Sequence, residues 1–353
     1  MIILDGKEGG GQILRTALAL STLTGKPFKI TNIRAKRANP GLRPQHYTSI
    51  KALQELTNAQ TDAQLNSKEL MFIPKKYKAQ NKTIDIGTAG STTLLLQSIL
   101  LPAMFSTKTH TLTIKGGTDT KWSIPADFFK NVLLPQYNRV SSIDLKLIKR
   151  GYYPKGRGEI RLKIQPKFKN KNFETLWKEL QKNNFDLTEQ GKLITIKGIS
   201  HASKNLIERQ VAERQATAAK QALRILEKPI EIRTEYQETL STGSGITLWA
   251  VFSKQEDEID QKNPTIIGAD ELGEPRKTAE QIGLTAANKL IKTIQSKAGT
   301  DEHTADNLIP LMALCKPSKI KVPKITEHIR TNIKTTEKFL QTRFKIQEKI
   351  ISS

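Results

Sequence analysis

The feature that most constrains the fold of this chain is a pattern that recurs along it. A short apolar run is followed by a glycine-bearing or polar loop, and that loop by apolar residues at helical spacing. The pattern begins near residues 2, 84 and 320. A strand and the helix that follows it bury their apolar faces against each other, which is the arrangement of α/β domains. The sequence therefore predicts an α/β (α+β) fold built from repeated βαβ-type units.

The pattern is interrupted in the middle of the chain. A polar spacer at residues 168–172 precedes the interruption, which contains a predicted amphipathic helix over 207–226 and a charged, exposed connection over 253–263. The earlier pattern returns with a predicted helix that starts at residue 278. We therefore expect residues 1–184 and 276–353 to form the core, with residues 185–275 inserted as a separate small α/β domain.

The charge of the chain favours polyanionic partners. Lys and Arg outnumber Asp and Glu by 57 to 34, which gives a net charge of +23. The electrostatic field of such a positive charge attracts RNA or DNA, although a lysine-rich composition without a nucleic-acid role would give the same net charge. The one cysteine, Cys315, excludes an intramolecular disulfide. Because no apolar run approaches the roughly 20 residues of a membrane span, and the N-terminus lacks a signal-peptide pattern, we expect a soluble, cytoplasmic protein.

A glycine-rich loop and a basic loop are candidates for anion binding. Three glycines at residues 9–11 precede a predicted helix, so that backbone N–H groups can approach an anion there. Glu8 before them could hold a divalent metal beside a polyphosphate, and Arg15 could contact phosphate. Residues 34–46 carry four cations, among them Arg34 and Arg37, which suit bidentate phosphate contacts. The plain alternatives are a tight turn and a solvated basic loop.

Two histidines lie near the predicted starts of C-terminal helices. His303, Asp306 and Asn307 share one face of a helix, which could contact a nucleotide or form a polar helix start. His328 opens another helix after a strand. The helix N-terminus disfavours an imidazolium, so the ring would be neutral and nucleophilic; the alternative is a capping or surface histidine.

Taken together, these motifs resemble the RNA 3′-terminal phosphate cyclase family over nearly the whole chain. The resemblance rests on the following segments, in chain order: Asp5-Gly6 with residues 8–15, residues 33–37 with Pro40-Gly41-Leu42 and Gln45-His46, residues 87–91, residues 116–119 with Pro125-Ala126-Asp127, Gly243-Ser244-Gly245, residues 303–306, and His328 with Thr331-Asn332. Each motif alone is weak, but the ordered set is specific.

The resemblance implies both a fold and a reaction. The fold would be related to the enolpyruvyl-transferase architecture, with one inserted domain. The reaction would use ATP and a divalent metal, Mg²⁺ or Mn²⁺, on RNA with a 3′-phosphate end. A histidine would take AMP from ATP, AMP would move to the RNA 3′-phosphate, and the neighbouring 2′-hydroxyl would close a 2′,3′-cyclic phosphodiester.

The resemblance also assigns residues to roles. His328 falls on the nucleophile and Glu8 on the metal-binding glutamate. Arg34, Arg37 and Gln45 fall on positions that contact the RNA phosphate. The positions that bind the nucleotide are Arg15, Gln97, Ile124, Pro125, His303, Asp306 and Asn307. Asn307 stands where glutamine is usual, and Ile124 where some members have a proline against the adenine.

Two rival functions fit parts of the sequence. A cyclase-like ribosome-biogenesis factor would share the fold, but would bind or process pre-ribosomal RNA without an adenylylated histidine. An enolpyruvyl-transferase-like enzyme would act on small anions and would not need the positive charge. His328 and the Glu8 loop favour the cyclase. The sequence leaves open the physiological RNA, the oligomeric state and the role of the inserted domain.

Overall fold

Three four-stranded sheets of the computed structural model share one topology, which confirms the predicted repetition. The structure describes residues 1–169, 172–254 and 264–353, so the predicted polar spacer and connection lie partly outside the described residues, at 170–171 and 255–263. In each repeated unit the chain runs strand, helix, strand, helix, strand, strand. The strands lie in the order first, second, fourth, third; the first two are parallel and the other pairs antiparallel.

The first two units are continuous in sequence. The first contains β1 (Ile2–Asp5), α1 (Gln12–Thr24), β2 (Phe28–Thr31), α2 (Pro44–Thr57), β3 (Gln60–Thr61) and β4 (Leu70–Ile73). The second contains β5 (Lys82–Asp85), α3 (Thr92–Met104), β6 (His110–Gly116), α4 (Ala126–Phe128), a π-helical turn (Phe129–Leu133), α5 (Leu134–Tyr137), β7 (Ser141–Lys149) and β8 (Gly158–Pro166). The helix predicted over residues 125–134 is thus one irregular helix of three segments.

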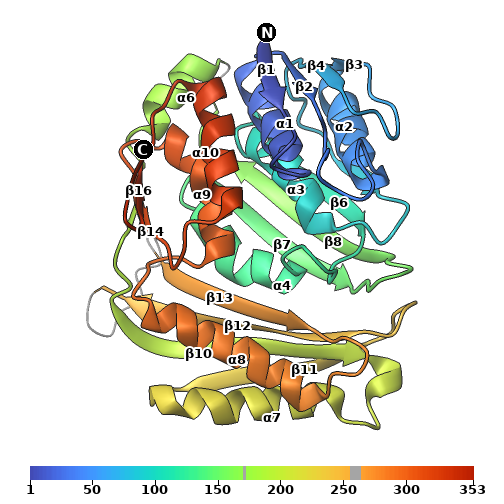
Figure 1. The fold of residues 1–353 in the computed structure, drawn as a ribbon, viewed down its shortest axis with the longest axis vertical. Coiled ribbons are helices and arrows are strands. Elements are labelled where there is room, and N and C mark those ends of the chain that lie inside the picture. The colour runs from blue at the N-terminus through green and yellow to red at the C-terminus, as the bar shows by residue number, and fades with distance from the viewer. Residues whose placement is uncertain (170–171, 255–263) are drawn as a thin grey trace.

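The third unit is split. Its first strand, β9 (Asp186–Leu187), follows α6 (Phe173–Leu180) and pairs in parallel with β14 (Lys319–Lys321). The remaining elements are α9 (Glu302–Leu314), α10 (Glu327–Leu340), β15 (Lys345–Gln347) and β16 (Ile350–Ser352). Figure 1 shows these red elements beside the blue first unit, although the two are at opposite ends of the sequence. In the sequence, the inserted unit lies between β9 and α9.

The inserted unit forms the lower layer in Figure 1. It contains β10 (Lys192–Ser203), α7 (Val211–Leu223), β11 (Ile230–Gln237), β12 (Ser244–Ser253), β13 (Thr265–Leu272) and α8 (Ala279–Gln295), with short 3₁₀ turns on either side of α7. Its sheet has the order β11-β10-β12-β13. Its apolar core is separate and includes Ile282 and Leu290 of α8, so the packing of this unit continues beyond residue 275, where the sequence interpretation ended it.

Helix α8 stays with the insertion because it packs tightly on α7. A Cβ atom at Gly283 of α8 would lie 2.1 Å from the carbonyl oxygen of Gln215 in α7, so that only glycine fits this contact. The apolar spacing of α8 predicted a helix with a buried face, but periodicity does not indicate which sheet that face covers.

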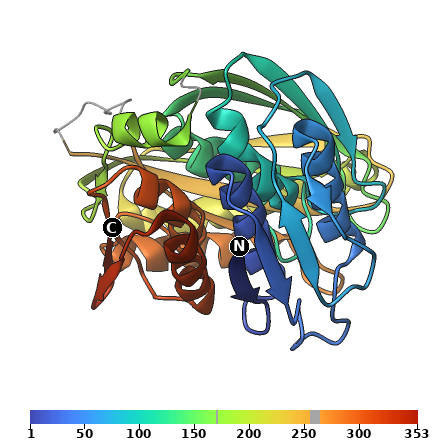
Figure 2. The same ribbon diagram turned by 90° about the horizontal axis from the view of Figure 1, so that it is seen from above.

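The three repeated units share one apolar core. Helix α3 is buried almost all round, as its sequence predicted, and α1 packs against both α3 and α10. Seen from above, the blue, teal and red helices of the three units gather in the interior (Figure 2). Among the described residues, no helix is long and apolar enough to cross a bilayer.

Candidate active site

The glycine loop before α1 is shaped by close neighbours. A Cβ atom at Gly11 would lie 2.1 Å from Nε2 of His46, and Gly10 adopts a φ of +56° with the Arg37 guanidinium nearby, 3.6 Å from its ideal Cβ position. Helix α1 begins at Gln12, and its N-cap residue Gly11 provides no side-chain cap. Its first N–H groups therefore face a basic environment without a capping oxygen, which is the arrangement that binds anions at helix N-termini.

A polar network centred on Asp306 joins the first and third units. Gln12 Nε2 of α1 donates to both carboxylate oxygens of Asp306, at 2.5 and 2.6 Å. Asn332 Nδ2 of α10 donates to Oδ1 of the same residue at 2.8 Å, and its own Oδ1 accepts from Thr16 Oγ1 at 2.5 Å. Burial raises the pKa of Asp306, against the effect of the nearby His328 ring and of the Gln12 hydrogen bond. Three helices thereby hold one carboxylate in place.

A second chain of hydrogen bonds extends from Arg15 to the second unit. Arg15 Nε donates to Gln97 Oε1 of α3 at 2.7 Å, and Gln97 Nε2 donates to Asn307 Oδ1 at 2.9 Å. Asn307 in turn donates to the carbonyl of His303 at 2.8 Å and accepts at its own carbonyl from Tyr137 at 3.1 Å. Burial lowers the pKa of Arg15 to about 10, opposed by Asp306, so the guanidinium remains charged at neutral pH. The structure thus brings four of the predicted nucleotide-site residues together.

The basic loop lies against the glycine loop. Arg34 adopts a φ of +56° and donates from NH1 to the carbonyl of Asn39 at 2.7 Å, which stiffens the loop. The ring of His46, which is buried, accepts at Nδ1 from the Arg43 backbone N–H at 3.2 Å. Burial, followed by the charges of Arg15, Arg34 and Arg43, lowers the pKa of His46 to about 3. The neutral ring therefore carries its proton on Nε2, which faces the glycine loop.

Glu8 lies at the exposed edge of this region. Lys36 Nζ contacts Glu8 Oε1 at 2.9 Å, and the ammonium groups of Lys36 and Lys334 lower the pKa of Glu8. One carboxylate fits a Mg²⁺ ion that takes its other ligands from phosphate oxygens and water. It does not by itself make a closed metal cage, and Lys36 would have to leave Glu8 for a metal to bind.

The two candidate histidines lie at the starts of α9 and α10. His328 is exposed in the first turn of α10, after Thr326, whose Oγ1 caps the helix by accepting from the Ile329 N–H at 3.2 Å. His303 is exposed in the first turn of α9, and the Phe128 ring meets it edge to face with centroids 5.8 Å apart. Neither ring is buried in a core, so both are available to a ligand.

The remaining candidates border the same region. Gln45 Nε2 is 3.5 Å from the carbonyl oxygen of Ser91, at the start of α3. Ile124 is buried, and its carbonyl accepts from Thr93 Oγ1 of α3 at 2.7 Å. Pro125 follows it as the N-cap of α4. The Ile124 side chain therefore contributes mainly to packing, while its backbone fixes the segment that leads into α4.

Sequence reasoning did not select three residues that organise these networks. Gln12, Asn332 and His46 all belong to the motifs, but nothing in their local pattern indicates a partner. Gln12 and Asp306 are 294 positions apart. Only the contact of α1 with α9 and α10 reveals the pairing.

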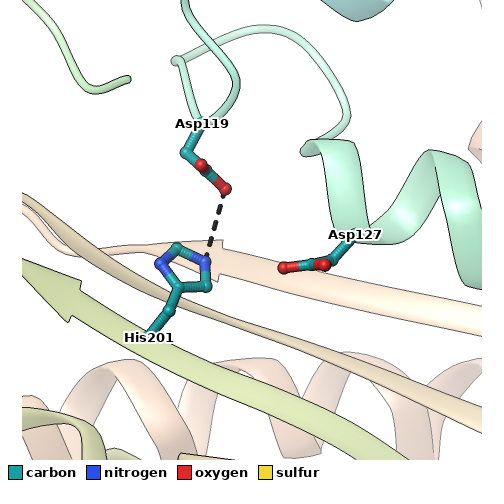
Figure 3. A group of neighbouring side chains, drawn as sticks. All are labelled: Asp119, Asp127 and His201. Carbon is teal, nitrogen blue, oxygen red and sulfur yellow. Dashed lines mark ion pairs between the residues drawn. The ribbon is translucent and has the colours of Figure 1, made fainter. Parts of the chain in front are cut away.

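A buried charged cluster lies outside this site, between the second unit and the inserted unit. Arg150 at the end of β7 is 1% exposed; it donates to Asp119 at 3.2 Å, to Asp127 at 2.5 Å and, through Nε, to Glu235 of β11 at 2.9 Å. His201 of β10 approaches Asp119 at 3.3 Å (Figure 3). Within the described residues, His201, Asp119 and Asp127 have ligand-type atoms within 4.8 Å of one another.

The cluster is a link between the units rather than an open metal centre, because the guanidinium of Arg150 already supplies positive charge to the carboxylates. Tyr152 OH and Nδ1 of His201 are 2.7 Å apart, and their rings stack with centroids at 5.9 Å. Burial, with the charge of Arg150, lowers the pKa of His201 well below its usual range, so the ring is neutral. Most polar groups of the cluster therefore pair across the contact, whereas Nε2 of His201 is buried 3.3 Å from Asp119 without a hydrogen bond.

The whole chain is similar to known proteins of one family. Residues 6–346 match the family model described as RNA 3′-terminal phosphate cyclase. The chain is 42% identical to the RNA 3′-terminal phosphate cyclase of Pyrococcus furiosus, over 98% of this chain and 95% of the relative. It is 42% identical to that of Saccharolobus islandicus, over 99% and 97%, and 40% identical to that of Pyrobaculum aerophilum, over 98% and 94%. With this coverage and identity, the chain belongs to the RNA 3′-terminal phosphate cyclase family.

Proposed function

We propose that this protein is an ATP-dependent enzyme that converts the 3′-terminal phosphate of RNA to a 2′,3′-cyclic phosphodiester, through a covalent histidine–AMP intermediate and an RNA-adenylate. Relatives that match nearly the full chain carry the name of this activity. The observation that carries the proposal is the meeting of α1, α3, α9 and α10, at which Arg15, Asp306 and His328 from distant parts of the sequence come together.

His328 is the proposed nucleophile. Its nitrogen lone pair attacks the α-phosphorus of ATP, the bond from that phosphorus to the bridging oxygen breaks, and pyrophosphate leaves. The exposed ring in the first turn of α10 is accessible to such a substrate. The neutral imidazole has the free lone pair that this attack requires.

Two transfers follow. An oxygen of the RNA 3′-phosphate attacks the phosphorus of the histidine-bound AMP, and the phosphorus–nitrogen bond breaks. The neighbouring ribose 2′-hydroxyl then attacks the activated 3′-phosphorus, loses its proton and expels AMP, which closes the cyclic ester. Phosphoryl chemistry of this kind depends mainly on positioning and charge neutralisation.

Charge neutralisation is assigned to the cations around the glycine loop. Arg15 would contact the phosphates of ATP, and Arg34, Arg37 and Gln45 the phosphate of the RNA end. Glu8 would hold a divalent metal, Mg²⁺ or Mn²⁺, whose charge would stabilise phosphate oxygens. Lys36, whose ammonium pairs with Glu8 at 2.9 Å, would be displaced when the metal binds.

The nucleoside of ATP is assigned to the side of Arg15 that lies away from the glycine loop. His303 would lie against adenine, with Ile124 and Pro125 on the facing segment. Gln97, Asp306 and Asn307 would orient the nucleotide. The hydrogen bond of Gln97 to Asn307 and that of Asn332 to Asp306 preorganise these side chains before it binds.

The decisive experiment uses α-labelled ATP without RNA. The wild-type protein with Mg²⁺ or Mn²⁺ should acquire an acid-labile AMP label, and His328→Ala should acquire none. Glu327→Ala is the matched control, since it alters the adjacent exposed residue of the same helix turn and should keep the label. With a 3′-phosphate RNA, the wild type should form the cyclic end and leave a 3′-hydroxyl RNA unchanged. Cyclase activity at the wild-type level in His328→Ala would contradict the assignment.

A further inference from the structure

Two aromatic side chains project into solvent from neighbouring loops. Trp122, between β6 and α4, is 90% exposed, and Tyr153, between β7 and β8, is 76% exposed. Trp122 also adopts a φ of +65°, in the left-handed region. For a bulky residue this conformation is an outlier that costs on the order of 1–3 kcal/mol. Neither exposure nor strain stabilises the fold, so a binding role is the physical explanation to test.

The two loops are held side by side. The Thr118 backbone N–H donates to the carbonyl of Gly151 at 2.9 Å, and Asp119 pairs with Tyr152 in a parallel bridge. At the tip of the first loop, Ser123 Oγ donates to the carbonyl of Thr120 at 2.9 Å. Trp122 therefore stands on an ordered turn, and less entropy is lost when a ligand stacks on it.

Both loops also carry cations, of which Arg157 pairs with Asp85 at 3.2 Å. Lys121 places its ammonium 5.6 Å from the centroid of the Trp122 ring while also pairing with Glu274 at 2.9 Å. Lys155 and Arg157 are exposed on the second loop. Aromatic faces interleaved with cations are the surface that binds single-stranded nucleic acid, because bases stack on the rings and phosphates approach the cations.

The patch adjoins the candidate active site. The loop that carries Trp122 continues directly to Ile124 and Pro125. At its other end, the Gly117 N–H donates to the carbonyl of Gly90 at 2.8 Å, in the segment that Gln45 contacts through Ser91. A chain whose 3′-phosphate reached Gln45 and the basic loop would have its last nucleotides at this patch.

From this arrangement we propose that Trp122, with Tyr153 beside it, stacks bases at the 3′ end of single-stranded RNA, while Lys121, Lys155 and Arg157 contact the RNA backbone. This proposal deepens the function proposed above and rests on it. Stacking on an aromatic face does not discriminate strongly among the four bases, so the patch would accept RNA ends of any sequence.

The test measures RNA binding without ATP, so that it does not depend on catalysis. The probe is a single-stranded ten-nucleotide RNA with a 3′-phosphate, at low salt. Trp122→Ala should bind it about tenfold more weakly, and Trp122→Phe within about twofold of the wild type, because phenylalanine restores the stacking face. Ile225→Ala is the matched control, since Ile225 is another exposed apolar residue, 74% exposed, in the inserted unit. It should leave RNA affinity unchanged.

A second arm removes the base instead of the ring. The wild type should bind RNA with abasic sites at its last two nucleotides about tenfold more weakly than intact RNA. Trp122→Ala should bind the two RNAs with the same, low affinity. Equal affinity of wild type and Trp122→Ala for intact RNA would overturn the proposal. The proposal would also fail if Trp122→Ala lost AMP labelling but bound RNA with wild-type affinity, because the ring would then serve ATP binding. Absence of AMP labelling in the wild type, with the binding differences preserved, would refute the cyclase mechanism and leave the stacking surface standing.

Discussion

Replacing Arg150 by methionine removes the guanidinium that contacts Asp119, Asp127 and Glu235 together. Asp119 and Asp127 are 2% and 3% exposed, so water cannot take over the role of the lost cation. Methionine fills much of the volume of the arginine stem, which keeps the loss of packing small. The substitution therefore isolates the electrostatic effect at the contact between the second unit and the inserted unit.

The expected cost is about 3–5 kcal/mol in the free energy of unfolding, the range for removing one partner of a buried ion pair. Urea unfolding followed by circular dichroism measures it.

Arg214→Met provides the matched control. Arg214 also pairs with a glutamate, Glu280, at 2.6 Å, but both side chains are more than 40% exposed. Its loss should cost less than about 1 kcal/mol. If Arg150→Met were no more destabilising than Arg214→Met, the cluster would not stabilise the contact between the two units.

Three further predictions concern the site and its surroundings. Glu8→Ala should lower AMP labelling at limiting metal and recover part of it at higher metal concentration, and equal labelling at limiting metal would mean that Glu8 is not a ligand. Asn332→Ala should cost about 1–3 kcal/mol in urea unfolding, because Thr16 and Asp306 lose hydrogen-bond partners, and a neutral result would show that water replaces the amide. Burial raises the pKa of Asp270 to about 6 from its ordinary value of 3.8, so the folded state holds this proton more tightly and stability falls as pH rises from about 4 to 6. Asp270→Asn should therefore be more stable than wild type by up to about 3 kcal/mol at pH 7 and equal to it near pH 4, and an unchanged difference across this range would refute the shift.

Much of the fold could be predicted because local chemistry determines it. The start of α10, for example, is specified by Thr326, and the end of α1 by Gly25, which adopts a left-handed conformation with a φ of +73°. These signals lie within a few residues of the feature they specify. The repeated strand–helix pattern extended the same reasoning to the α/β fold class.

Contacts between distant segments could not be predicted in the same way. β9 is two residues long and acquires its role only by pairing with β14, so that no local pattern marks where the third unit begins. Arg150 and Glu235 are 85 positions apart and belong to different units. For the site, the motifs selected His328 and Asp306, but the hydrogen bonds that organise Asp306 come from Gln12 and Asn332, which only the packed helices bring together.

The split third unit has a consequence for the order in which the chain acquires its structure during synthesis. The first two units are complete in sequence by Pro166, whereas β9 gains its partner only after residue 319 has been made. The apolar face of α1 that α10 covers therefore stays uncovered until nearly the whole chain exists. Because contacts between distant residues form slowly, the last stage of folding should be the closure of the N- and C-terminal segments on each other. A nascent chain that ends before α10 should accordingly expose the apolar face of α1 on an otherwise folded N-terminal half. Such a chain should depend on chaperones until α10 has been synthesised.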